Sequence, residues 1–583
     1  MKILGQAQQL IAPQGQRMSS KTESAYDWLA PSALKNGSEM PGNKPHDQSF
    51  SQPDSFARRA IFASIVAFAV LCAVALRWYR LGAQSLWLDE SFTAWNASLS
   101  VRNIIRVAQN TDFPPLYFML ERYWTTLFGN SEVGLRSLSA LVGTLSLPVF
   151  YLLCKKVLKD SMAVALALWL FAFSIMQIWF SREARTYELG SFVALVSLYE
   201  LVLFLEKRTA VRFALIVACI AISIYLHNML FFYVLGLNCT WLTYPSNRNW
   251  TERLKEVMLA NGLAALFYLP WLPSLFHQVI GKAVGGFWVA RPTFEGLFQT
   301  LCILTGFFPD YLSAIAGRLL PWPAHACWVG VLVGISVLYT AMITGGFRRG
   351  NRIEKQKIIA FLLYGLIPLI AVFAFSRITT SVFLDRIFTN SSLIFPIVFA
   401  FPLAVQKNRT ERVLFGILAV IFAASAALST VGYLRYTEKE DWRDATASVL
   451  RIPEGNRLIV FVARTMQIPF DYYTERLSKA GPHVEEMGLP IGYLERFPSL
   501  PGDSSIASMN QIKKLTLAID SKKYSEIDLV LSHEINGDPH GFVLDYLDRS
   551  FPRHEEQLFY GVKVIRFFAP SNSHWRPLPE GMR

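Results

Sequence analysis

Charged residues are scarce in this 583-residue sequence. Asp, Glu, Lys and Arg together make up 17% of it, whereas a typical soluble protein carries about 25%. Hydrophobic residues make up 52%, and many of them gather in runs of about 20 residues, the length at which an α-helix crosses a bilayer. This composition excludes an ordinary soluble globular protein and predicts a multi-span integral membrane protein.

Cysteine is also scarce, and its spacing fits neither disulfides nor zinc. No CxxC pair occurs, and each of the six cysteines falls in an apolar stretch: Cys72, Cys154, Cys219, Cys239, Cys302 and Cys327. The signatures HExxH, GxSxG and the P-loop are absent as well. The sequence therefore offers no support for a zinc protease, a serine hydrolase or a nucleotide-driven pump.

The N-terminus lacks the continuous apolar core of a signal peptide. Residues 1–57 are rich in Ser, Gln, Asn and Lys, which predicts a disordered tail. The first apolar run, 60–76, then acts as an uncleaved anchor. Arg58 and Arg59 precede it, which places the N-terminus in the cytoplasm by the positive-inside rule.

The sequence predicts about eleven transmembrane helices. They lie near 60–76, 135–154, 161–180, 188–205, 212–227, 229–244, 257–273, 323–343, 358–375, 387–404 and 412–430. In this threading every strongly basic loop falls on the cytoplasmic side: KKVLKD, EKRTAVR, PSNRNWTERLK, GGFRRGNRIEKQK and QKNRTER. The net charge of +13 is thus explained by membrane topology, and no nucleic-acid partner is predicted.

Two larger segments fall on the extracytoplasmic side. One is a long first loop, 77–134, within the membrane domain 58–430. The other is 431–583, where helical segments such as DWRDATASVL alternate with short β-like runs, namely LIVFVA at 458–463, IDLVLS at 527–532 and VKVIRFF at 562–568. The fold class is therefore an all-α multi-span membrane domain followed by a small soluble α/β domain, in the inner or plasma membrane of the cell.

The first loop carries two adjacent carboxylates in SLWLDESFTAW, Asp89 and Glu90. The segment 99–109 that follows has the pattern of an amphipathic helix lying on the membrane surface, and PPLYFMLERYWTTLF begins a further helix. Such a loop would hold the acid pair at the lipid–water boundary. The alternative is that both acids only begin a helix, favoured by its dipole.

Other polar residues are predicted on the same side of the membrane. Arg182 and Arg185 would share one face of a helix, where they could bind a phosphate or anchor the helix to headgroups. Tyr187 follows them, and His227 ends the fifth span, where a structural role is the alternative. Asp385 and Arg386 open the tenth span and could instead pair with each other. Asp112 could N-cap the helix that starts at the two prolines.

Six motifs in order make the chain resemble a known family: LWLDESFTAW, DFPPLYFMLERYW, SREARTYEL, LPWLPSL, DRIF and DWRDA. Together they resemble bacterial membrane glycosyltransferases of the GT-C fold, related to protein O-mannosyltransferases and the aminoarabinose transferase of lipid A. The resemblance covers about residues 77–445. It implies a polyprenyl-phosphate sugar donor and a glycan, glycolipid or protein acceptor.

The resemblance also implies roles for individual residues. Asp89 and Glu90 match the catalytic acid pair, and Arg185, with Tyr187 beside it, matches the lipid-phosphate site, to which Arg182 and Arg386 could contribute. Relatives often carry Lys or His before the two prolines, where this chain has Phe113 after Asp112. Contacts made there in relatives, to donor or acceptor, are therefore not carried over.

The predicted reaction is an inverting hexosyl or pentosyl transfer with Asp89 as the general base. The alternatives are a lipid-linked glycan ligase and a lipid or solute transporter, although a transporter would place its charges near the middle of its spans. No definite cofactor is predicted. A divalent cation could bind if Asp89, Glu90, Asp385 and His227 converge.

Overall fold

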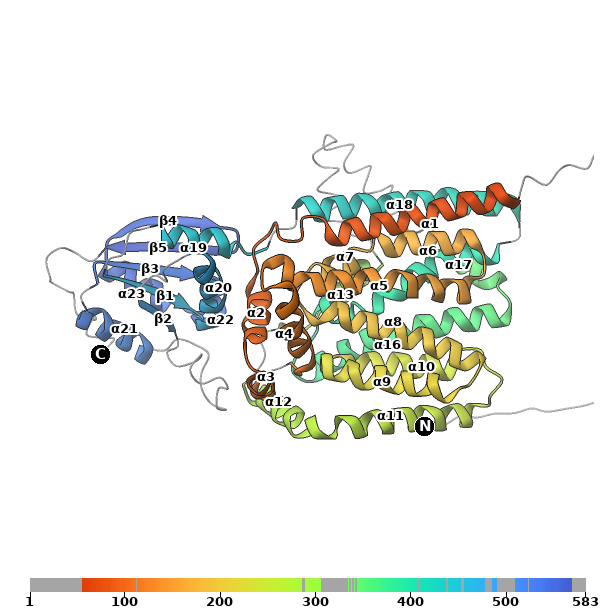
Figure 1. The fold of residues 1–583 in the computed structure, drawn as a ribbon, viewed down its shortest axis with the longest axis horizontal. Coiled ribbons are helices and arrows are strands. Elements are labelled where there is room, and N and C mark those ends of the chain that lie inside the picture. Colours follow the sequence, from red (N-terminus) through yellow and green to blue (C-terminus); the bar gives the residue numbers. More distant parts are fainter. Residues whose placement is uncertain are drawn as a thin grey trace, which may run out of the picture. The chain divides into compact units, whose positions relative to one another are not determined.

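A computed structural model describes residues 55–111, 113–285, 289–305, 343–406, 408–436, 439–451, 456–477, 485–489, 509–522 and 524–568, with isolated helical positions at 334, 337 and 340. The predicted tail 1–57 lies almost wholly outside these residues, as does most of the span predicted near 323–343. The part from Phe56 onward forms one compact unit, which combines a helical bundle with a small sheet (Figure 1).

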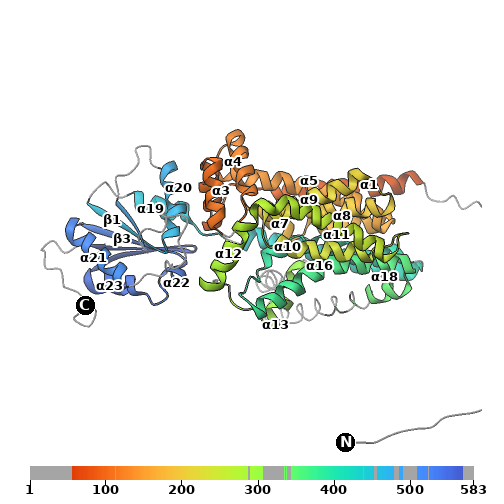
Figure 2. The ribbon, with the colours of Figure 1, turned by 90° about the horizontal axis from the view of Figure 1, so that it is seen from below.

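Every regular element of the membrane domain that the structure describes is a helix (Figures 1 and 2). Its elements are α1 Ser55–Trp78, α2 Leu88–Ser98, α3 Val101–Asn110, α4 Leu116–Phe128, α5 Glu132–Leu158, α6 Ser161–Ala172, α7 Ile175–Ser181, α8 Thr186–Glu206, α9 Ala210–Leu226, α10 Leu230–Thr243, α11 Trp250–Tyr268, η1 Leu269–Trp271, α12 Leu272–Gly285, α13 Phe294–Leu304, α16 Arg352–Ile378, η2 Asp385–Phe388, η3 Ser391–Ile394, α17 Phe395–Val405 and α18 Arg409–Tyr436.

Six of the described helices are long and apolar enough to cross a membrane, and a seventh span results if α6 and α7, bent by 48°, count as one. Four apolar stretches are shorter: α9, α10, α13 and 391–405. The predicted multi-span membrane fold is therefore confirmed. The number eleven stays a prediction.

The five basic loops gather at one end of the bundle, because ion pairs join them to one another. Lys156 lies 2.7 Å from Glu206, and Arg208 lies 2.7 Å from Glu256. Two further pairs, Arg412 with Asp160 and Arg349 with Glu411, connect the remaining loops. The chain thus turns back at this end as the threading requires, and the cytoplasmic location of this end stays a prediction.

Close packing of α10 against α16 depends on Gly236. A Cβ atom at this position would lie 2.5 Å from the backbone carbonyl oxygen of Tyr364 and 3.1 Å from Cγ of Pro368. Small residues allow helices in a membrane to approach in this way, so that the contact area between the two backbones increases. No side chain fits here without moving one of the helices.

Gly236→Ala is therefore expected to lower the free energy of unfolding by about 1–3 kcal/mol, because overpacking forces the two helices apart. Gly262 in α11 is the matched control, since a Cβ there would meet nothing within 4 Å. Gly262→Ala should leave the free energy of unfolding unchanged or raise it slightly. Thermal unfolding of the purified protein in detergent measures both variants, and equal melting temperatures would contradict the packing argument.

α3 forms where an amphipathic surface helix is predicted, but its apolar face is covered by protein. Ile104 is fully buried in the main core. Ala108 packs in a small cluster with Tyr268 and Trp271, and its carbonyl oxygen accepts a hydrogen bond of 2.8 Å from Nε2 of Gln278. The pattern of apolar residues predicts the helix correctly, whereas the surface that it faces depends on distant segments of the chain.

The C-terminal part is the predicted small α/β domain. Its sheet has the order β2-β1-β3-β5-β4, with β2, β1 and β3 parallel and β5 and β4 antiparallel. The elements are α19 Trp442–Leu450, β1 Arg457–Val462, η4 Arg464–Met466, α20 Gln467–Leu477, β2 Glu485–Leu489, α21 Met509–Lys522, β3 Glu526–Leu531, α22 Glu534–Gly537, α23 Phe542–Ser550, β4 Arg553–Phe559 and β5 Val562–Phe568. β1, β3, β5 and α19 occupy the predicted runs, while β2 and β4 were not predicted.

This domain shares a hydrophobic core with the first loop. One buried cluster contains Leu86, Ala94, Leu135 and Ala184 of the membrane domain together with Trp442, Phe461 and Phe470 of the C-terminal domain. Burying apolar surface stabilises the contact by about 25 cal/mol for each Å² removed from water. The first loop and the C-terminal domain therefore hold each other in place, and both adjoin the acid pair.

Candidate active site

The acid pair opens α2. Asp89 and Glu90 lie in the first turn of this helix, where the helix dipole favours negative charge. Because they are neighbours on a helix, their side chains point in different directions. The side chain of Glu90 is fully buried, whereas that of Asp89 is 25% exposed. The two carboxylates therefore occupy different environments.

Glu90 is bound by Arg136 at the start of α5. Nε of Arg136 donates to Oε1 of Glu90 at 2.8 Å, and Nη2 donates to Oε2 at 2.6 Å. The other N–H groups of Arg136 donate to three backbone carbonyls of the first loop, those of Leu81, Gln84 and Ser85, at 2.8–2.9 Å. All five donors of the guanidinium are thus used, and Arg136 fixes the first loop against the bundle.

Two further groups bind the Glu90 carboxylate. The ammonium of Lys439 lies 3.2 Å from Oε2 and also 3.4 Å from Oε1 of Glu183, and the backbone N–H of Ala184 donates to Oε1 at 3.0 Å. Burial alone would raise the pKa of Glu90, but Arg136 and Lys439 outweigh it and lower the pKa to about 2. Glu90 is therefore a permanent carboxylate surrounded by cations, placed to hold α2.

Asp89 faces two arginines. Its Oδ2 accepts a hydrogen bond of 2.9 Å from Nη1 of Arg386 and lies 3.7 Å from Nη2 of Arg185. Nη1 of Arg185 also donates to the Asp89 carbonyl oxygen at 3.1 Å. Although burial alone lowers the pKa of Arg185, Asp89 leaves that pKa raised above its ordinary value. One carboxylate therefore lies beside two permanent cations.

Aromatic rings orient these two guanidinium groups. Arg185 lies over the ring of Phe113 at 4.7 Å and near that of Tyr187 at 5.9 Å. Arg386 lies 6.0 Å from the rings of both Trp87 and Tyr187. Cation–π contacts of this kind hold a guanidinium plane without using its N–H donors. The donors therefore stay directed toward an anionic partner.

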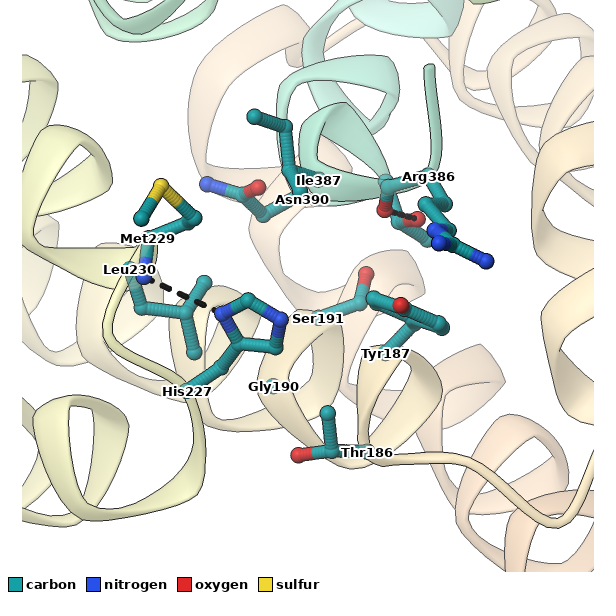
Figure 3. A pocket seen from close by; sticks show the side chains of 11 residues that line it. Thr186, Tyr187, Gly190, Ser191, His227, Met229, Leu230, Arg386, Ile387 and Asn390 are labelled. Atoms are coloured by element: carbon teal, nitrogen blue, oxygen red, sulfur yellow. Dashed lines mark hydrogen bonds between the residues drawn. The ribbon is translucent and has the colours of Figure 1, made fainter. Parts of the chain in front are cut away.

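A pocket adjoins these residues between the start of α8, the end of α9 and the segment 386–390 (Figure 3). Figure 3 shows Tyr187 and His227 on one side, with Asn390 opposite them. Nδ1 of His227 accepts a hydrogen bond of 3.0 Å from the backbone N–H of Met229. The lining residues are Thr186, Tyr187, Gly190, Ser191, His227, Met229, Leu230, Arg386, Ile387, Thr389 and Asn390.

The structure brings together most of the predicted site residues, but not all of them. α7 ends at Ser181 and α8 begins at Thr186, so Arg182 and Arg185 do not share a helix face. Arg182 donates instead to the carbonyl oxygen of Leu76 at 3.1 Å. Asp385 accepts a hydrogen bond of 2.5 Å from Thr300 in α13, and Asp112 lies outside the described residues.

Within the described part of the chain, no three His, Cys, Asp or Glu side chains gather as they would to hold a metal ion. The convergence of Asp89, Glu90, Asp385 and His227 that would create a cation site is therefore not observed among these residues. Glu90 is instead bound by Arg136, and Asp385 by Thr300.

Several residues of the site were not predicted. Arg136 and Lys439 are the cations that bind Glu90, and Glu183 is the second carboxylate near Lys439. Glu121 in α4 is fully buried, and burial raises its pKa to about 8. A signal for Arg136 did exist, since a charge at the start of an apolar span is costly and therefore needs a partner.

Comparison with known proteins supports the predicted family. Residues 112–274 match the protein family described as dolichyl-phosphate-mannose-protein mannosyltransferase. No curated protein sequence matches the chain.

Solved structures show the fold. The apo structure of ArnT from Cupriavidus metallidurans is 12% identical, with a TM-score of 0.54, over 88% of this chain and 98% of that chain. The same enzyme bound to undecaprenyl phosphate, also 12% identical with the same coverage, gives a TM-score of 0.47. The oligosaccharyltransferase of Archaeoglobus fulgidus, tethered to an acceptor peptide, is 14% identical, with a TM-score of 0.43 over 83% of this chain and 70% of that chain. The likeness to apo ArnT shows that this chain has the GT-C fold.

Proposed function

We propose that this chain, with its GT-C fold, is a membrane glycosyltransferase that moves a sugar from a polyprenyl-phosphate donor to an acceptor hydroxyl. The observation that carries the proposal is the placement of Asp89 beside Arg185 and Arg386, 3.7 Å and 2.9 Å from its Oδ2. The matching family takes its name from a sugar on a polyprenyl phosphate, which is the donor proposed here. The reaction takes place on the extracytoplasmic side of the inner or plasma membrane, with the N-terminus in the cytoplasm.

Asp89 acts as the general base. An acceptor hydroxyl becomes a strong nucleophile only as its proton leaves, and a carboxylate within hydrogen-bond reach can take that proton. The acceptor oxygen then bonds to the anomeric carbon from the face opposite the phosphate, while the bond from that carbon to the phosphate oxygen breaks. The configuration is inverted, the electron pair leaves on the phosphate, and Asp89 keeps the proton.

The two arginines stabilise the leaving group. A polyprenyl phosphate leaves as a stable anion, so that no second carboxyl is needed as an acid, unlike in glycoside hydrolysis. Guanidinium groups bind phosphate oxygens in a bidentate manner and stabilise the charge that develops there. A phosphate that engages Arg185 and Arg386 competes with Asp89 for the same donors and thereby frees the carboxylate to act as base.

Arg185→Lys is expected to lower kcat/KM by about tenfold, because lysine is a point charge that cannot bind phosphate in a bidentate manner or stack on Phe113. Arg106→Lys is the matched control, since Arg106 is exposed on α3. This variant should transfer sugar at the wild-type rate. Initial rates at varied donor concentration measure both variants. Equal rates for Arg185→Lys and wild type would exclude a phosphate-binding role.

The decisive test uses the full-length protein in detergent or proteoliposomes with a synthetic polyprenyl-phosphate sugar. We expect release of polyprenyl phosphate that depends on the acceptor, together with an inverted product. Extracts of cells that lack the protein, compared by mass spectrometry of envelope glycans and glycolipids, identify the sugar and the acceptor. Transfer of an intact lipid-linked glycan would indicate a ligase instead. Movement of substrate across the bilayer without transfer would indicate a transporter.

A further inference from the structure

The helix that carries Asp89 has no cap of its own. Trp87 occupies the N-cap position of α2, and no side chain there makes a capping hydrogen bond. The first N–H groups of a helix have no partner within the helix, and a capping side chain usually accepts from them. At α2 this acceptor has to come from elsewhere in the chain.

Glu440 supplies that acceptor from the segment that leads into the C-terminal domain. Its Oε2 accepts a hydrogen bond of 3.2 Å from the backbone N–H of Leu88, the first residue of α2. The same oxygen accepts from Nε1 of Trp442 at 2.8 Å, and Oε1 lies 2.5 Å from Nε2 of His533. The carboxylate is 12% exposed. Trp442 and His533 of the C-terminal domain fix it in place, and it is directed at the N-terminus of α2.

The backbone of Glu440 is bound to the first loop as well. Its carbonyl oxygen accepts from the hydroxyl of Ser85, and that hydroxyl in turn accepts from the backbone N–H of Trp442 at 3.1 Å. A further contact lies nearby, since the Tyr473 hydroxyl accepts from the N–H of Leu86 at 2.7 Å. The position of Glu440 relative to the start of α2 is therefore set by several independent bonds.

Lys439, the preceding residue, acts on the same turn. Its ammonium is 10% exposed and lies 3.2 Å from Glu90 and 3.4 Å from Glu183. The first turn of α2 is thus held at two points by consecutive residues, one that accepts from its N–H and one that neutralises its buried carboxylate. Asp89 lies between Leu88 and Glu90, the two residues so held.

We propose that Lys439 and Glu440 form a positioning clamp for Asp89, and that the C-terminal domain serves transfer by holding this clamp in place. The inference rests on the proposed function, because it assigns Asp89 as the base. Glu440 is a positioning residue: it contacts α2, and through α2 it fixes the direction of the Asp89 carboxylate. Arg185 and Arg386 belong to other elements, the N-cap of α8 and η2, and substitutions at Glu440 leave both side chains in place.

Glu440→Ala removes the acceptor at the start of α2. We expect kcat to fall about tenfold. The loss of a helix cap destabilises the first turn by a free energy that corresponds to about a tenfold change in rate. Donor affinity should stay the same because both arginines are retained. Glu440→Gln keeps a carbonyl oxygen that can accept from Leu88, so kcat should recover to within about threefold of wild type. A purely structural role would not separate kcat from donor affinity in this way.

The matched control is Glu534→Ala, which removes an exposed acid beside His533 and should leave both kcat and donor affinity unchanged. Thermal unfolding in detergent verifies that each variant is folded. If Glu440→Ala does not fold, Glu440→Asp replaces it, because the shorter side chain withdraws the carboxylate from Leu88. The same fall in kcat is then expected.

Three outcomes overturn the clamp: wild-type kcat in the folded Ala or Asp variant, a loss confined to donor affinity, or a loss in Glu440→Gln as large as in Glu440→Ala. Failure of the proposed function is distinct, since the wild-type protein itself would then release no polyprenyl phosphate. Hydrogen exchange of the peptide that contains Leu88 gives an independent measurement. It should speed up in Glu440→Ala and not in Glu534→Ala.

Discussion

Asp89→Asn is expected to lower kcat by about 10²–10⁴-fold, the contribution typical of a positioned general base. Asparagine has nearly the same shape and can still accept the hydrogen bond from Arg386 that Asp89 accepts at 2.9 Å. It has no basic oxygen that can take the proton of the acceptor. The fold and the donor affinity should therefore be retained, and the fall should appear in the transfer step alone.

The measurement is single-turnover transfer at saturating donor, with donor binding determined separately. Asp545→Asn is the matched control, because Asp545 is 55% exposed on α23 and pairs only with Arg549 among the contacts described for its side chain. It should react at the wild-type rate. Wild-type turnover by Asp89→Asn, at unchanged expression, would remove Asp89 from the role of base.

Arg136→Met is expected to destabilise the protein by about 3–5 kcal/mol, the cost of removing one partner from a buried ion pair. Methionine fills a similar volume but leaves Glu90 without two hydrogen bonds and three loop carbonyls without their donor. Adding Glu90→Gln should recover part of this loss, because the buried carboxylate is then absent. The two substitutions should therefore be clearly non-additive.

Unfolding in mixed micelles, followed by tryptophan fluorescence, measures the change. Lys156→Met is the matched control, because the Lys156–Glu206 pair is more than 40% exposed on both sides and surface pairs contribute about 0–1 kcal/mol. Similar effects of Arg136→Met and Lys156→Met would show that the Arg136–Glu90 pair is no more important than a surface pair.

The sequence predicts those parts of the fold that depend on local patterns. Apolar runs locate α1, α5, α8, α16 and α18, and short β-like runs locate β1, β3 and β5. Acids after Trp87 predict the first turn of α2. The ends of elements are less predictable: α7 ends at Ser181, so the spacing of Arg182 and Arg185 does not place them together.

The site depends on contacts that no local pattern contains. Arg386 reaches Asp89 across 297 positions of the chain, and the Glu440 carboxylate reaches Leu88 across 352. The family resemblance brings Asp89, Arg185 and Arg386 into consideration, but it gives no indication of Arg136 or Lys439. Their roles follow from burial, because a carboxylate as enclosed as Glu90 requires cations close to it.

The shared core of the first loop and the C-terminal domain has a consequence for biogenesis. A ribosome makes α2 early and makes its outer cap at Glu440 only after 352 further residues. In the proposed topology, the nascent chain inserts its spans and exports its last domain before the contacts between Glu440 and α2 can form. A chain that stops before Glu440 lacks the acceptor for the backbone N–H of Leu88, so the proposed clamp on α2 cannot form in it.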